Sequence, residues 1–223
     1  MSEFDFEPVR GLPAPLPEGE TLLWQGHPEW QALARRAFHV GHVALYFALL
    51  GVWALLASWE GGGLAGALAS AIWVPAMAAA AIALLASLAW LSARTTVYTI
   101  TDRRIMLRIG IALPIIINVP FRTIQSVGLH RHRDGTGDLP VALSRGYRLA
   151  FLVLWPHARP WFVRNPQPML RCIAEPERIG RLLAEAISAA PARSAARSAA
   201  VTEPVPVHRP VPGAAGSLPV ATA

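Results

Sequence analysis

Lysine is absent from the chain, whose 20 basic residues are all arginine. This absence excludes Schiff-base chemistry on a lysine amine and the phosphate-binding lysine of P-loop proteins and kinases. Cysteine occurs once, at Cys172, so the chain can form neither an internal disulfide nor a thiolate zinc cluster. Charged residues make up only 15% of the chain, against 53% hydrophobic residues. That balance is too apolar for an ordinary soluble domain and indicates membrane-spanning segments.

Two long apolar runs occupy the first half of the chain, over residues 38–59 and 64–91. A helix needs roughly 20 apolar residues to cross a bilayer core, so each run is long enough for one crossing. Arginines precede the first run and follow the second, whereas the short EGGG connection has none. The positive-inside rule then places both termini in the cytoplasm. We expect a multi-pass membrane protein with a transmembrane helical hairpin over residues 38–91.

Small residues recur at helical spacing in the first apolar run. They are Gly41, Ala44, Ala48 and Gly51. Small side chains let helix backbones approach closely in lipid, so this set predicts a helix-packing face. The pattern leaves open whether that face packs on the second helix of the hairpin or on another membrane protein.

Histidines occur in two groups that raise the question of pigment or metal binding. His39 and His42 begin the first apolar run and are candidate ligands of a chlorophyll or haem. The alternative is that both are interfacial residues that face headgroups or the cytoplasmic domain. Further on, His130, His132 and Asp134 would share one face of a strand, but the D-G step favours a polar hairpin tip instead. We therefore expect no metal site.

After residue 91 the apolar pattern changes from helical to alternating. Short runs rich in β-branched residues predict strands over 94–101, 104–110, 114–120, 123–130, 137–144, 147–155 and 160–165. A helical stripe follows over 175–187. This order predicts an α+β membrane protein, in which a small antiparallel β barrel or sandwich of pleckstrin-homology type occupies residues 92–189 and is capped by the C-terminal helix. Residues 1–37 are expected to form a cytoplasmic N-terminal segment, and 190–223 a disordered Ala/Pro-rich tail.

Positive charge is concentrated in the predicted domain. Residues 93–189 contain 14 arginines and 6 acidic residues. A basic domain held at the bilayer is expected to contact anionic lipid headgroups. The candidate membrane-surface patch is Arg94, Arg103, Arg104 and Arg108. We expect no nucleic-acid partner because no recognition motif is present. The carboxylates are too few and scattered for acid–base chemistry, so neither an enzyme nor a cofactor is expected.

The segment FLVLWPHARPWFVRNPQPMLRCI, residues 151–173, concentrates prolines, tryptophans and a histidine. Because prolines suit turns and sheet edges, the segment predicts a proline-stiffened hairpin. Its exposed edge is a candidate docking site for a partner subunit. The residues of that edge are Trp155, His157, Arg159 and Trp161. The alternative is that these side chains simply close the barrel.

Two segments, LPEGETLLWQGHPEW (16–30) and TTVYTITDRRIMLRIG (95–110), resemble bacterial membrane proteins that carry a pleckstrin-homology domain. Together with RAFHVGHVALYF (36–47) and the LWPHARPW and PQPMLRCI segments of 154–173, they resemble PuhB-type photosynthetic complex assembly proteins of purple bacteria. The resemblance covers roughly residues 10–189.

The resemblance implies a chaperone-like assembly factor that transiently binds unassembled reaction-centre or core antenna subunits. It places the protein in the bacterial inner (cytoplasmic or photosynthetic) membrane. It also implies self-association as a homodimer, and it carries over no catalytic residue. Two alternatives remain open. One is a membrane-anchored lipid-binding or scaffold module with no photosynthetic role, and the other is a pigment or haem carrier that uses His39 and His42.

Overall fold

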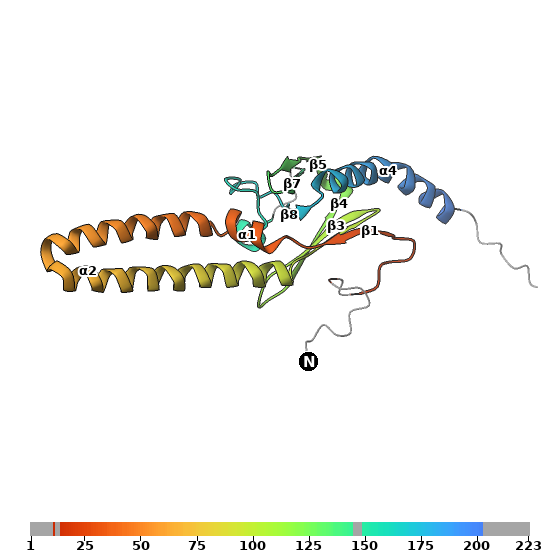
Figure 1. The fold of residues 1–223 in the computed structure, drawn as a ribbon. Coiled ribbons are helices and arrows are strands. Elements are labelled where there is room, and N and C mark those ends of the chain that lie inside the picture. Colours follow the sequence, from red (N-terminus) through yellow and green to blue (C-terminus); the bar gives the residue numbers. More distant parts are fainter. Residues whose placement is uncertain (1–10, 12–13, 145–148, 203–223) are drawn as a thin grey trace, which may run out of the picture. The chain divides into compact units, whose positions relative to one another are not determined.

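The structure is a computed structural model that describes residues 11, 14–144 and 149–202. The chain divides after Ala190 into two units, and the contacts described below lie within the first. The elements, in chain order (Figure 1), are β1 (Leu22–Gly26), α1 (Trp30–Arg36), α2 (Val40–Thr95), β2 (Val97–Thr101), β3 (Arg104–Ile109), β4 (Ile115–Pro120), the short 3-10 helix η1 (Phe121–Thr123), β5 (Ile124–Val127), β6 (His130–Arg131), β7 (Thr136–Leu143), α3 (Phe151–Leu154), β8 (Met169–Ala174) and α4 (Pro176–Thr202).

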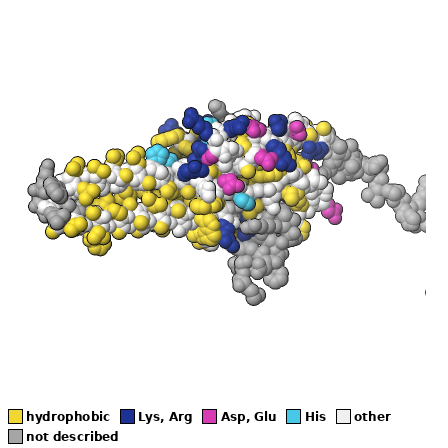
Figure 2. Space-filling view, viewed as in Figure 1, with side chains coloured by type: hydrophobic (Ala, Val, Ile, Leu, Met, Phe, Trp, Pro, Cys, Tyr) yellow, Lys and Arg dark blue, Asp and Glu magenta, His cyan; other side chains and the backbone are white. Residues whose placement is uncertain are grey.

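The long element α2 is an apolar helical hairpin. Its two arms meet at Gly63, whose φ of 57° and ψ of −148° leave the helical region; glycine adopts such a positive φ at little cost. The segments Val40–Ser58 and Ala71–Thr95 are long and apolar enough to cross a membrane. Large apolar side chains cover the outside of both arms, as the yellow surface in Figure 2 shows. The prediction of two long apolar helices before the β domain is thus confirmed.

Two antiparallel sheets of four strands form the body of the protein. The first has the order β1-β2-β3-β4, and in the second β7 pairs with β5, β6 and β8. Strand β1 precedes the hairpin and β2 follows it, yet the two pair, with Trp24 opposite Ile100. The hairpin returns the chain to its starting point, and β1 then satisfies backbone groups on the edge of β2. Part of the segment expected at residues 1–37 therefore belongs to the body.

The core of the body lies between the sheets and α4. Strand β2 is buried along its whole length, and Tyr98, Ile100 and Leu107 have no exposed surface. Ile179 and Leu183, four residues apart on α4, pack into the same cluster. This spacing places both on one face of the helix. The helix therefore caps the sheets, and the predicted α+β order of antiparallel strands followed by a C-terminal helix is confirmed for the body.

A second apolar cluster joins the hairpin to the body. It combines residues of α1, both arms of α2 and Cys172 of β8. Backbone contacts fix α1 at both ends, because Glu29 N–H donates to the Cys172 carbonyl at 2.8 Å and the Arg171 guanidinium donates to the Arg36 carbonyl at 3.0 Å. The start of α2 is therefore held in a defined position against β8.

The C-terminal third differs from the prediction. The strands expected over 147–155 and 160–165 are replaced by the short helix α3 and a loop, and residues 145–148 lie outside the described residues. Prolines in this segment lack the N–H that a continuous ladder requires. Helix α4 continues to Thr202, past residue 190 where a disordered tail was expected; the remaining tail, 203–223, also lies outside the described residues.

Candidate functional site

His157 is completely buried, and both of its ring nitrogens have partners. Nδ1 lies 2.6 Å from the hydroxyl oxygen of Tyr98, and Nε2 lies 3.0 Å from Oγ1 of Thr96. The Tyr98 oxygen also accepts the backbone N–H of Arg171 at 3.1 Å. A neutral imidazole protonated on Nε2 satisfies this chain of bonds, because Tyr98 then donates to Nδ1 and the ring donates to Thr96. We call these four residues the His157 cluster.

The electrostatics of the His157 cluster agree with a neutral ring. Burial, and secondarily the positive charge of Arg171, lowers the pKa of His157 from its usual 6.5 to about 3. Burial also raises the pKa of Tyr98 well above its usual value. Both side chains are therefore uncharged at neutral pH. The cluster ties the loop after α3 to β2 and β8, which is a structural role.

The predicted docking edge is only partly exposed. Trp161 is 95% exposed, so it is free to meet a partner. His157 points inward to Tyr98 and has no exposed surface, so its assignment to a docking edge is wrong. The reason is tertiary, since a hydroxyl on a distant strand supplies the hydrogen bond that draws the ring into the interior.

Two further side chains of that edge have protein partners. Trp155 is about half-exposed, and its ring packs edge-on against Phe38 with the centroids 5.4 Å apart. Arg159 donates to the Gln167 side chain at 2.9 Å, and its guanidinium lies 4.2 Å from the centroid of the Phe162 ring. Trp155 thus touches the base of the hairpin, and Arg159 is held in a defined orientation.

The four arginines predicted as a membrane-surface patch do not lie together. They are Arg94, Arg103, Arg104 and Arg108. Arg104 forms a bidentate pair with Glu20, with both N–O distances 2.7 Å, and Arg108 is buried. The turn that holds Arg103 lies at the end of β2 remote from α2, roughly 17 Å along a five-residue strand. Arg94 stays at the end of the hairpin, 5.2 Å from the Trp90 ring centroid, and the buried Arg108 pairs with Val97 near that same end.

The predicted helix-packing face is divided. Ala44 and Gly51 are half-buried, and a Cβ on Gly51 would lie 3.7 Å from Cγ1 of Val74 in the second arm. Gly41 and Ala48 are exposed. The four positions cover about 80° of the helix circumference. The second arm contacts the side that holds Gly51 and leaves the side that holds Gly41 and Ala48 accessible.

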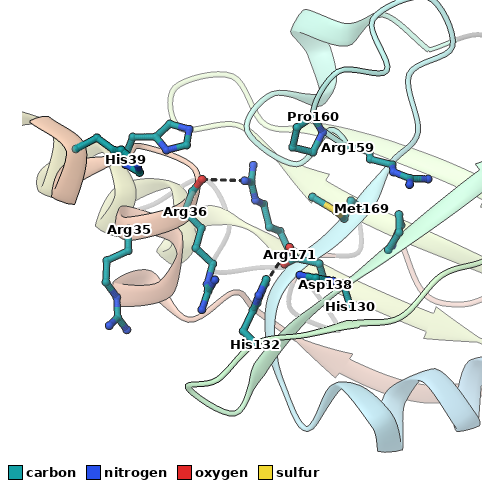
Figure 3. Close-up of a pocket in the computed structure, with 12 residues that line it drawn as sticks. Arg35, Arg36, His39, His130, His132, Asp138, Arg159, Pro160, Met169 and Arg171 are labelled. Carbon is teal, nitrogen blue, oxygen red and sulfur yellow. Dashed lines mark hydrogen bonds and ion pairs between the residues drawn. The ribbon is translucent and has the colours of Figure 1, made fainter.

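A pocket of about 640 Å³ lies where α1 and the start of α2 meet β6, β7, β8 and the loop after α3. Figure 3 shows residues of α1 and the start of α2 on one side and those of the loop on the other, with Arg171 between them. The described residues that line it include one carboxylate, Asp138. They also include four arginines and four histidines: Arg35, Arg36, Arg159, Arg171, His39, His42, His130 and His132. We call this site the basic pocket.

Acidic side chains neutralise only part of the charge around the basic pocket. Asp134, at the tip of the β6–β7 hairpin, lies 3.0 Å from a guanidinium nitrogen of Arg36 and 3.5 Å from one of Arg35. Hydrogen bonds from the Thr136 hydroxyl and from Arg36 hold the pKa of Asp134 well below its usual range. Asp134 therefore stays ionised and ties the hairpin tip to α1.

Two arginines of the basic pocket have neutral partners instead. Within the described part of the chain, neither Arg159 nor Arg171 forms an ion pair. Arg171 donates to the carbonyl oxygens of Pro156 at 2.8 Å and Arg36 at 3.0 Å, and its Nε has no partner among the described residues. Its positive charge is thus fixed in place by groups that do not neutralise it.

A bulge in the β7–β8 ladder shapes one wall of the basic pocket. At the bulge Cys172 has a φ of 51°, and its N–H donates to the Asp138 carboxylate at 2.8 Å. The second oxygen of Asp138 lies 3.1 Å from Nε2 of His132. Burial, and then the charge of Asp138, raises the pKa of the Cys172 thiol to about 12. The thiol is therefore protonated and unreactive.

The structure shows where the two histidine groups lie that the sequence raised as candidate metal or pigment ligands. Among the described residues, no group of three or more His, Cys, Asp or Glu side chains is placed to hold a metal ion. Asp134 pairs with the arginines of α1, while the His132 ring contacts Asp138 instead. His39 and His42 are exposed, with ring centroids 5.3 Å apart. Their role as pigment ligands stays a prediction.

Three residues that define these sites are missing from the sequence-based candidates: Tyr98, Asp138 and Arg171. Tyr98 lies within the alternating pattern of a predicted strand, so nothing local distinguishes it from an ordinary core residue. Asp138 and Arg171 carry a signal that was available, because each is a charged residue within a segment that otherwise has a strand pattern. A charge at such a position requires a specific partner.

The comparisons with known proteins agree with the fold. A family model described as a bacterial PH domain matches residues 37–187. Over 189 residues the chain is 43% identical to the "Uncharacterized 23.7 kDa protein in puhA 5'region" of Rhodobacter capsulatus, which covers 84% of this chain and 88% of that protein. No solved structure gives a significant match.

Proposed function

The chain belongs to the bacterial PH domain family, and we propose that it is a membrane-anchored assembly factor for the photosynthetic reaction centre and its core antenna. The observation that carries the proposal is the relative at 43% identity, which is encoded in the puhA region, a photosynthetic gene context. The match extends over most of both chains, so it includes the hairpin and the body together.

The surface of α2 supports the membrane anchor. Leu49, Trp53 and Trp73 are each more than 60% exposed, and similar side chains cover both arms. Water-soluble proteins rarely expose apolar patches of this extent, whereas lipid solvates them without cost. We propose that both arms cross the inner membrane and that both termini lie in the cytoplasm, because arginines flank the outer ends of the hairpin.

The end of the body that adjoins the hairpin also carries exposed apolar residues. Leu113, in the turn between β3 and β4, is 80% exposed, and β3 pairs with β2 next to the end of α2. Leu152 and Trp161, in and after α3, are 86% and 95% exposed. Exposed apolar side chains at these positions suit the headgroup region of a bilayer or the cytoplasmic surface of a membrane subunit. They favour a body that lies close against the membrane.

We further propose that the protein acts by binding and not by catalysis. Its hairpin holds an unassembled reaction-centre or antenna subunit, with Gly41 and Ala48 on the accessible helix face, while the body contacts the subunit's cytoplasmic part. A partner that binds only the unassembled state stabilises that state and raises the local concentration of the pieces. Self-association as a homodimer belongs to the same proposal.

A tagged pull-down from mildly solubilised membranes tests the function. Reaction-centre or antenna subunits should be recovered from cells in which photosynthetic complexes have just been induced, and should be lost at steady state. The Gly41→Leu/Ala48→Leu variant tests the proposed binding face. Its leucines block the accessible helix face, so it should lose the subunits while remaining in the membrane. Normal complex levels in a strain that lacks the gene would contradict the proposal.

Topology is tested separately. Green fluorescent protein fused after residue 202 should fluoresce, and alkaline phosphatase inserted at the turn near Gly63 should be active. The reverse pattern would exclude the orientation, and recovery of the whole chain in the soluble fraction would exclude the membrane anchor.

A further inference from the structure

We propose that the basic pocket binds the phosphate group of an anionic phospholipid from the leaflet into which the hairpin inserts. The inference rests on the proposed function only in taking α2 as a membrane hairpin, and it does not depend on a photosynthetic role. The pocket lies beside His39 and His42 at the start of α2, which is the level at which headgroups meet the protein.

The charge of the basic pocket matches a phosphate anion. Arg171 is only 9% exposed, and its guanidinium donates to two backbone carbonyls and forms no ion pair with a described carboxylate. Arg159 lines the opposite side, and the Phe162 ring and the Gln167 side chain already orient its guanidinium. Guanidinium groups present several N–H donors in a plane that suits phosphate oxygens. The pocket is thus preorganised for an oxyanion, and Figure 2 shows arginine and histidine side chains gathered where the hairpin meets the body.

The surroundings of the basic pocket are apolar on the loop side. Pro160 lines the pocket, and the next three residues, Trp161, Phe162 and Val163, are 95%, 37% and 62% exposed. A tryptophan and its apolar neighbours at the edge of a cationic site are typical of segments that enter the membrane interface. Nothing in the described chain covers this loop, which we call the 161–163 loop.

The helix side continues the same surface into the hairpin. Tyr46 and Leu49 lie four and seven residues after His42, on the same face of the first arm, and are 60% and 64% exposed. A phosphate held in the basic pocket would therefore place its acyl chains along this face. This continuity favours a lipid over an acidic peptide, because a peptide needs polar contacts beyond the anion and this surface supplies apolar ones.

The test uses the full chain, purified in a neutral detergent and stripped of lipid. It is titrated with dihexanoylphosphatidylglycerol, dihexanoylphosphatidylcholine, inorganic phosphate and a poly-glutamate peptide, and bound molecules are counted by native mass spectrometry. One phosphatidylglycerol should bind per chain, and the Arg35→Gln/Arg159→Gln variant should weaken that binding about tenfold or more. Because Arg35 and Arg159 are at least partly exposed, this variant should retain the fold.

The matched control is Arg122→Gln/Arg178→Gln, which removes the same charge from exposed positions away from the pocket. Arg178 pairs with Glu175 at 2.9 Å, much as Arg35 pairs with Asp134, so each double variant breaks one surface ion pair. The control should bind phosphatidylglycerol as the unaltered chain does. Equal weakening in both double variants would overturn the proposal, and so would inorganic phosphate or poly-glutamate that binds as tightly as the lipid.

A second measurement tests the membrane side without weakening the pocket. A polarity-sensitive dye attached to Trp161→Cys should report an apolar environment in nanodiscs, whereas the buried Cys172 stays unlabelled in the native protein. Emission typical of water would show that the 161–163 loop does not enter the interface and would overturn the assignment to a membrane lipid. Both measurements use purified protein, so their outcome is independent of whether the protein assembles photosynthetic complexes.

Discussion

Histidine and arginine side chains gather at two neighbouring places in this protein, and the partners of the two sets differ. In the His157 cluster both ring nitrogens are bonded to protein groups and the ring has no exposed surface. In the basic pocket four arginines and four histidines surround an open volume with one carboxylate. The same residue types thus serve structure where they are enclosed within the protein, whereas in the basic pocket they line an open volume that a ligand can enter.

Arg171 connects the two places. Its backbone N–H belongs to the His157 cluster, and its side chain enters the basic pocket. The buried cluster therefore sets the position of one of the charges in the pocket. Variants in the His157 cluster should therefore reduce stability, whereas variants of the exposed arginines in the basic pocket should mainly reduce ligand binding.

Replacement of His157 should have the largest effect on stability. The His157→Ala change leaves the Tyr98 and Thr96 hydroxyls without their buried partner and opens a cavity, so the free energy of unfolding should fall by about 3 kcal/mol or more. Chemical denaturation of the full chain in detergent measures it. The control is Trp161→Ala at a 95% exposed position, which should change the value by less than about 0.5 kcal/mol. An equal fall in the free energy of unfolding for both variants would contradict the structural role of His157.

The Arg171→Met variant should rank second. It keeps the bulk of the side chain but removes two hydrogen bonds to the carbonyls of Pro156 and Arg36, at a cost of about 2–3 kcal/mol. The same denaturation experiment applies. Arg159→Met, which removes one bond to a half-buried glutamine, should cost clearly less. An equally large loss of stability in Arg159→Met would mean that the two hydrogen bonds of Arg171 do not specifically stabilise the fold.

The pH dependence of stability should report the neutral His157. Between the usual pKa of 6.5 and the folded value of about 3, the unfolded chain binds a proton that the folded chain does not. Stability conferred by the neutral ring is therefore complete above pH 6.5 and is lost as the pH falls, by about 2 kcal/mol between pH 7 and pH 5. Comparison with His157→Gln isolates this term, since the variant should lack it. Parallel pH profiles would contradict the assignment.

The smallest effect is expected at the tip of the β6–β7 hairpin. Asp134→Asn removes the ionic contacts with Arg35 and Arg36 and should cost about 1 kcal/mol or less, because these groups are partly exposed. The loss should shrink at high salt. Glu177→Gln, which breaks an exposed pair with Arg131, is the control and should have almost no effect. A larger loss in the control would show that the tip does not fix α1.

Sequence patterns predicted the parts of this fold that depend on local periodicity. A repeat within ten to twenty residues identifies the two apolar runs and the alternating strands β2 to β4. The two-residue D-G step likewise marks the hairpin tip at Asp134. The basic patch shows the limit of such reasoning. Arg104 lies in an arginine-rich stretch, yet its charge is neutralised by Glu20, 84 residues earlier in the chain. No local window contains both partners.

The sequence by itself determined the apolar hairpin, the α+β order of elements, the lack of lysine chemistry and the resemblance to photosynthetic assembly proteins. Only the tertiary structure decided that His157 is interior, that β1 joins the sheet across the hairpin, and that a basic pocket forms around Arg171. The reason is physical. Periodicity reports which face of an element is apolar, whereas the burial and charge of a polar group depend on partners supplied by remote segments.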